Sequence, residues 1–323
     1  MSYNITLNSS NAVQGTFNNT YQYTFANGSF EVPEGSMLSI SQITIPYSWV
    51  NVSAALGNNV LGYAIPAGSS VQYFSTTLAD GFYDIAALNK ALQTLFISNG
   101  HYWVNTSSGT YNSVYYYPLT ISTNYSLYTN TITSVAIPTS GAGITTAFGS
   151  NVSAGSWSGG GYPSTLLSTY NYAALFIPQT VTSPASLGYL LGFNGGSSVI
   201  SPASVNGTFY PTLGVTTATT ISSNGNSLST PSVFAPLGSS VNGVIVRCNL
   251  VENKITNNTD ILDSFPIKNT YGSNINFEPQ MEHWIKLKAG KYNNITVYFQ
   301  DQNLNPLLML DKNVLITLMI KFP

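Results

Sequence analysis

Charged side chains are scarce in this sequence. Asp, Glu, Lys and Arg make up 6% of its 323 residues, against a typical share of about 25%. Arg247 is the sole arginine, and the formal net charge is −2. Because nucleic-acid binding depends on many basic contacts to phosphates, direct nucleic-acid binding is not expected. The surface of such a chain must be hydrated through uncharged polar residues, or much of it must be buried against other subunits.

Cysteine and long apolar runs are also nearly missing. Cys248 stands alone, which excludes an intrachain disulfide and a metal site built from cysteines. It lies in the strand-like run VIVRCNL, where we expect a small buried hydrophobic residue. No run approaches the roughly 18 apolar residues of a membrane span. The beginning of the sequence, MSYNITLNSS, lacks the features of a secretory signal peptide, so a cytoplasmic product is expected.

Aromatic and β-branched residues are abundant and predict an ordered, all-β protein. Aromatic residues form 13% of the chain, and 22 residues are tyrosines; disordered segments lack such residues. Short alternating runs separated by turn residues predict strands. They are TYQYTF, SMLSISQITIP with a bulge at Gln42, VQYFSTTL, NGVIVRCNLV, MEHWIKLK, YNNITVYFQDQ and KNVLITLMIKF. This all-β pattern predicts a sandwich or a jelly roll and not alternating strands and helices.

One short helix is expected at about residues 84–97. Ile85, Leu88, Leu92 and Leu95 form an apolar stripe at helical spacing, and an aspartate at 80 or 84 can cap its N-terminus. We expect this helix to cover an end of the sandwich.

The charges divide the chain into a body and an insertion. No Asp, Glu, Lys or Arg occurs between Ala91 and Val246. We therefore expect a jelly-roll body formed by residues 1–100 and 236–323. The charge-free residues 101–235 would form an inserted, mainly-β domain that projects outward.

Few side chains are available for catalysis, and no catalytic, cofactor-binding or metal site is predicted. Cys248 could form a peptidase pair with His101 or His283, but a packed His101, an exposed His283 and a buried cysteine are the simpler interpretation. Glu278 and Glu282 could face one side of a strand as a glycosidase pair, although solvated charges are the simpler interpretation.

Two loops resemble ligand sites only superficially. Asp301 in QDQNLNP lacks the repeated carboxylates of a calcium loop, and a turn closed by its side chain explains it better. The loop GSWSGGGYPS lacks the lysine of a phosphate-binding loop. Several Asn-x-Ser/Thr sequences are expected to be unmodified; they begin at Asn4, Asn27, Asn51, Asn105, Asn124, Asn151 and Asn206.

Four segments resemble the penton, or minor capsid, proteins of virophages and polinton-like viruses, with Sputnik-like virophages the nearest match. They are QITIPYSWVNV at 42–52, LADGFYDIAALNKALQ at 78–93, SLGYLLGF at 186–193, and the C-terminal NNITVYFQDQNLNPLLMLDKNVLITLMIKF. The resemblance implies a jelly-roll subunit that forms homopentamers at icosahedral vertices and contacts the major capsid protein. It also implies a virion location, with assembly in the host cytoplasm.

Other functions stay open at this stage. The chain could be a different minor capsid or cement component, or an attachment protein whose neutral, aromatic-rich middle binds a host-surface glycan or receptor. An enzyme is not expected, because titratable groups are so scarce.

Overall fold

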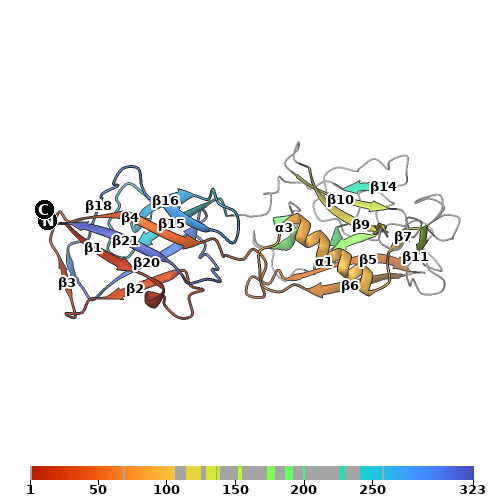
Figure 1. Cartoon of the computed structure of the whole chain (residues 1–323), viewed down its shortest axis with the longest axis horizontal. Coiled ribbons are helices and arrows are strands. Elements are labelled where there is room, and N and C mark those ends of the chain that lie inside the picture. The colour runs from red at the N-terminus through yellow and green to blue at the C-terminus, as the bar shows by residue number, and fades with distance from the viewer. Residues whose placement is uncertain are drawn as a thin grey trace. The chain divides into compact units, whose positions relative to one another are not determined.

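A computed structural model divides the chain into two compact units (Figure 1). Unit 1 is Met1–Val50 with Val241–Pro323, and unit 2 is Asn51–Ser240. Unit 2 is thus inserted between two strands of unit 1. The structure describes residues 2–67, 70–105, 114–124, 129–135, 137–138, 152–154, 173–178, 186–191, 199–200, 226–229, 241–256 and 258–323.

Unit 1 consists of two antiparallel sheets. The first has the order β1 (Ser2–Leu7), β21 (Leu315–Lys321), β4 (Met37–Pro46) and β17 (Asn274–Phe277), and β18 (Ile285–Lys286) also pairs with β4. The second has the order β16 (Ile261–Pro266), β15 (Gly243–Cys248), β20 (Asn294–Asp301) and β2 (Thr20–Thr24). A small ribbon of β3 (Phe30–Val32) with β19 (Gly290–Tyr292) and the 3-10 turn η1 (Ser9–Asn11) complete the unit.

The strand order of unit 1 is that of a jelly roll. Counted in chain order, the eight main strands are β1, β2, β4, β15, β16, β17, β20 and β21. The first sheet then reads one, eight, three, six, and the second reads five, four, seven, two. Strands distant in sequence pair in both sheets, as two Greek keys require. The predicted all-β jelly roll is confirmed.

Alternation along the strands builds the core of the sandwich. In β20, Ile295, Val297 and Phe299 are buried while the residues between them face outward. In β4 a bulge interrupts the alternation, because Gln42 pairs with Thr317 but Ile40 pairs with Leu318. The unpaired residue is therefore Ser41, one position before the predicted bulge. Of the predicted strand 281–288, β18 covers two residues.

The described residues of unit 2 lie mainly in strands. One sheet contains β13 (Val199–Ile200), β12 (Ala174–Phe176), β5 (Val60–Ala67) and β6 (Ser70–Thr77). The second contains β14 (Asn226–Ser229), β10 (Thr129–Val135) and β9 (Leu119–Asn124), and the third contains β11 (Val152–Ala154), β7 (Trp103–Asn105) and β8 (Val114–Tyr116). A short helix, α3 (Leu187–Leu190), lies within the motif SLGYLLGF.

The predicted helix is α1 (Ile85–Ser98), and it belongs to unit 2. The Asp84 carboxylate caps it by accepting a hydrogen bond from Ala87 N at 2.7 Å. Leu88, Leu92 and Phe96 are its buried residues. The helix packs against β9, β5 and β6, so the expectation that it covers an end of the jelly roll is wrong. Among the described helices, none is long and apolar enough to cross a membrane.

The division into units differs from the boundaries drawn from charge. Residues 51–100 were expected in the body, but β5 pairs with β6 and with β12, which ties this segment to unit 2 by backbone hydrogen bonds. The second boundary lies at Val241 instead of 236. Charge set the predicted boundary, whereas strand pairing sets the observed one.

The two junctions to unit 2 lie at one end of unit 1. β4 begins beside the chain termini, where Met37 pairs with Lys321, and runs to the opposite end (Figure 1). At that end, the segment 267–272 binds the chain close to both junctions. Gly272 N donates to Tyr47 O at 3.0 Å, and Ile267 N donates to Asn242 O at 3.1 Å. The insertion therefore leaves unit 1 at the end opposite the termini.

Candidate functional site

The cysteine and histidine candidates show no catalytic arrangement. Cys248 is fully buried, and this burial raises the pKa of its thiol to about 12. A thiolate nucleophile is therefore disfavoured. His101, in unit 2, lies with Nδ1 2.6 Å from Tyr63 Oη, and burial lowers its pKa to about 4. His283 is exposed in unit 1. These placements agree with the buried cysteine, packed His101 and exposed His283 that the sequence indicated.

The two glutamates do not share a strand face. Glu278 follows the end of β17 and Glu282 precedes β18, so neither lies in a strand, and both are exposed. Glu282 Oε2 accepts a hydrogen bond from Trp284 Nε1 at 3.0 Å. The expected same-face geometry is therefore wrong, and solvated charge describes both residues.

Asp301 closes a turn at the end of β20, as expected. Its Oδ1 accepts hydrogen bonds from the amides of Asn303 and Asn305, both at 2.8 Å. Its Oδ2 accepts from Asn305 Nδ2 at 3.0 Å. The carboxylate is 7% exposed, so its bonding capacity is used within the turn.

Every Asp, Glu, His and Cys of the sequence lies in a described range. Among these described residues, no group of three or more could hold a metal ion. The glycine-rich loop at 155–164 and the Asn-x-Ser/Thr sequences at Asn151 and Asn206 lie outside the described residues. The surfaces of the jelly roll are therefore the candidate functional sites.

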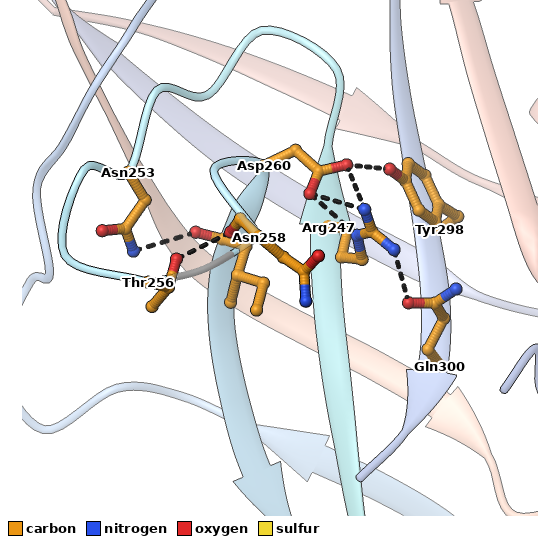
Figure 2. Close-up of polar contacts among 8 residues, drawn as sticks. Arg247, Asn253, Thr256, Asn258, Asp260, Tyr298 and Gln300 are labelled. Carbon is orange, nitrogen blue, oxygen red and sulfur yellow. Dashed lines mark hydrogen bonds and ion pairs between the residues drawn. The ribbon is translucent and has the colours of Figure 1, made fainter. Parts of the chain in front are cut away.

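Arg247, the sole arginine, is bound within one outer face of unit 1 (Figure 2). Its guanidinium donates to both Asp260 carboxylate oxygens at 2.6 to 2.9 Å and to Gln300 Oε1 at 2.8 Å. The guanidinium also lies 5.0 Å from the centre of the Tyr298 ring, while the Tyr298 hydroxyl donates to Asp260. β15 and β20 present Arg247, Tyr298 and Gln300 side by side, and Asp260 immediately precedes β16. We name these four residues the arginine network.

The electrostatics of the arginine network favour the ion pair. Partial burial alone raises the pKa of the Asp260 carboxyl, but hydrogen bonds from Arg247 and Tyr298 and the guanidinium charge outweigh it. The pKa of Asp260 is consequently held below its usual range. Burial and the neighbouring carboxylate raise the pKa of Tyr298 to about 12. The side chains of Arg247 and Asp260 are each 19% exposed, so the pair can be covered by another subunit without leaving either charge unpaired.

Two further carboxylates occur on the strands of this sheet. Asp301 belongs to the turn described above, and Asp263 lies on the edge strand β16. Burial raises the pKa of Asp263.

The sequence singled out Arg247 only because it is the sole arginine. Its pairing with Asp260, thirteen residues away, could have been suspected because charges are so few.

The outer face of the other sheet is almost uncharged. Three rows of residues cross its strands on the side away from the core, defined by the strand register: Asn4, Met319 and Ser39; Thr6, Thr317 and Gln42; Leu315, Thr44 and Asn276. Ser39 is fully buried, and the other eight are exposed or half-buried. We name these nine residues the neutral face. The charges of these fully described strands are Lys321 and Lys286, which both pair with Met37 at the end near the termini. The central rows carry none.

Apolar side chains are also exposed near the junctions to unit 2. Phe17 is 54% exposed and Leu310 is 56% exposed, and the intervening hydrogen bond from Met309 N to Phe17 O, at 3.0 Å, holds their segments together. Phe17 and Asn18 both have positive φ angles, 51° and 56°. The Asn18 side chain donates to Met309 O at 3.0 Å and stabilises this turn. Unit 1 therefore displays apolar surface at this turn.

Comparison with known proteins gives a distant structural likeness. No family model and no curated protein matches this chain. Among solved structures, the chain is similar to the crystal structure of the selenomethionine-labelled mavirus penton protein. The match covers 100% of this chain and 99% of that chain, with 10% identity and a TM-score of 0.37. The strand order and register identify the jelly roll independently of this likeness.

Proposed function

We propose that this chain is a structural protein of a virion, the penton subunit that forms homopentamers at icosahedral vertices and contacts the major capsid protein. The observation that carries the proposal is the neutral face, a sheet surface without charge in its central rows. Burying an unpaired charge at a subunit contact costs several kcal/mol. A face of Thr, Asn, Gln, Met and Leu avoids that cost.

A closed ring needs two different contact surfaces on each subunit, because neighbours meet head to tail. Unit 1 offers two: the neutral face on one sheet, and on the other sheet a face whose arginine is paired within the subunit. Low charge also limits repulsion between identical subunits. The resemblance of four sequence segments to virophage penton proteins supports the same function.

In this proposal unit 2 is the outward part of the vertex. Its junctions lie at the end of unit 1 opposite the termini, so the termini and the insertion would serve opposite sides of the shell. The proposed location is the capsid vertex, after assembly in the host cytoplasm. The proposal includes no catalytic role.

The test measures the mass and shape of the purified full chain by native mass spectrometry and negative-stain microscopy. A pentamer is expected at about 173 kDa, five times 34.6 kDa, with fivefold ring views. Thr317→Glu places a charge in the middle row of the neutral face and should abolish the ring. Thr270→Glu is the matched control, because Thr270 is an exposed threonine of unit 1 outside that face.

Circular dichroism must show that both variants retain the wild-type fold. A wild-type chain that stays monomeric at micromolar concentration and is absent from particles would refute the vertex function. If Thr317→Glu forms the same ring as the wild type, the neutral face is not the contact.

A further inference from the structure

Unit 2 contains a column of aromatic rings that runs from its core to its surface. The rings belong, in order, to Phe74 (β6), Tyr63 (β5), Phe96 (α1), Tyr117, which directly follows β8, and Tyr115 (β8). Successive ring centres are 5.1, 4.0, 6.1 and 6.5 Å apart, and the angles between successive ring planes are 21°, 27°, 29° and 14°. Tyr63 and Phe96 are fully buried, whereas Tyr115 is 45% exposed. The last ring, Tyr115, packs on Tyr117, which in turn packs on the buried Phe96.

Three phenol groups meet at the exposed end of this column. The Tyr102 ring centre lies 5.4 Å from that of Tyr115, with the ring planes inclined at 51°. Burial and the neighbouring phenols of Tyr115 and Tyr102 raise the pKa of Tyr117, which agrees with three adjacent side chains. Val114, at the start of β8, is 50% exposed beside them. We name Tyr102, Tyr115 and Tyr117 the tyrosine surface; it combines ring faces with hydroxyl groups.

The tyrosine surface has no charged neighbour along the chain. Between Ala91 and Val246 the sequence has no Asp, Glu, Lys or Arg. The last charge before this segment is Lys90 on α1, nine residues before the helix cap Asn99, or about 13 Å along the helix axis. The segment that carries the three tyrosines therefore supplies no counter-charge to a charged ligand, so the surface matches an uncharged partner.

We propose that the tyrosine surface binds a neutral pyranose oligosaccharide. The C–H face of a sugar ring can pack on the Tyr115 ring. The phenol hydroxyls can form hydrogen bonds with the sugar hydroxyls. Tyrosine is suited to both contacts because its ring is apolar and its hydroxyl group is polar. Because the Tyr115 ring already packs on Tyr102 and Tyr117, its side chain loses less freedom on binding than an isolated tyrosine would. Three partly exposed rings form a small surface compared with the roughly 800 Å² per partner of a protein interface, so a small ligand fits better than a second copy.

The test uses isothermal titration calorimetry of the full chain with three neutral probes, cellohexaose, chitohexaose and mannohexaose. Hexagalacturonate serves as a charged probe of similar length. Binding of at least one neutral probe is expected, with hexagalacturonate weaker. Tyr115→Ala should lower the affinity about tenfold or more, since ring packing supplies the contact. Tyr115→Phe keeps the ring and should stay within about threefold of the wild type.

Tyr73→Ala provides the matched control. Tyr73 is 50% exposed in the same unit, but its ring packs on Phe176 with centres 4.9 Å apart, outside the column. This variant should bind like the wild type.

Three results would overturn the site: no binding of any neutral probe at about 5 mM, equal binding by Tyr115→Ala, or equal binding of hexagalacturonate. A change of oligomeric state in Tyr115→Ala without sugar binding would instead identify the surface as a contact between copies. The inference stands apart from vertex assembly, because Thr317→Glu should lose the ring yet keep sugar binding.

Discussion

Separating Arg247 from Asp260 should destabilise unit 1 measurably. Arg247→Met keeps an apolar stem but removes four hydrogen bonds, three to Asp260 and one to Gln300. Breaking a fully buried ion pair costs roughly 3 to 5 kcal/mol, and exposed pairs contribute about 0 to 1 kcal/mol. With side chains 19% exposed, the expected loss is about 2 kcal/mol.

The pair contribution can be isolated with a double-mutant cycle of Arg247→Met and Asp260→Asn. The coupling free energy should be about 1 kcal/mol. Native-state hydrogen exchange of peptides that cover β15 and β20 is the suitable assay, because it reports on unit 1 separately from unit 2. A coupling below about 0.3 kcal/mol would refute the reasoning, since it would place the pair among exposed surface pairs.

The same pair sets a pH dependence with a definite sign. The pKa of Asp260 is lower in the folded state than in the unfolded state. Its stabilising contribution is therefore present above the unfolded-state pKa of about 3.9 and is lost as the pH falls through the folded-state pKa. Asp260→Asn should remove this acid-dependent part of the exchange profile. If the profile is unchanged in that variant, other carboxylates carry the acid sensitivity.

Other variants test the remaining structure. Gly62→Ala should destabilise unit 2 by about 3 kcal/mol or more in thermal unfolding, because its Cβ would overlap the Phe74 carbonyl oxygen. Gly28→Ala, with open space but a φ of +77°, should cost about 1 kcal/mol. Asp301→Ala should cost about 2 kcal/mol in urea unfolding through loss of its turn bonds, and chelators should not change wild-type stability. The ring protons of His101 should not titrate between pH 8 and 5 by NMR; since the folded-state pKa is lowered, stability should fall as the pH drops from about 6.5 toward 4. Cys248 should react with a thiol reagent at pH 8 only after denaturation, and rapid reaction of the native chain would contradict its burial.

Local structure could be predicted well where one physical signal dominated. Helix α1 was expected because its apolar residues recur at helical spacing after a capping aspartate, and it begins one residue after Asp84. Cys248 was expected to be buried because it alternates with valines in a strand. The segment 281–288 shows the limit: it alternates like a strand, yet only Ile285–Lys286 pair with β4. Alternation indicates which side chains can share a face, but a strand also needs a partner.

The sequence by itself determined that the protein is all-β, nearly uncharged and poor in catalytic groups. The first property follows from alternation over a few residues, and the other two follow from composition. Only the tertiary structure decided which strands meet. β4 pairs with β21 across hundreds of residues, and β15 pairs with β20 across tens. Residues 51–100 belong to unit 2, and the single arginine pairs with Asp260. Those contacts depend on long-range backbone pairing, which local sequence patterns do not encode.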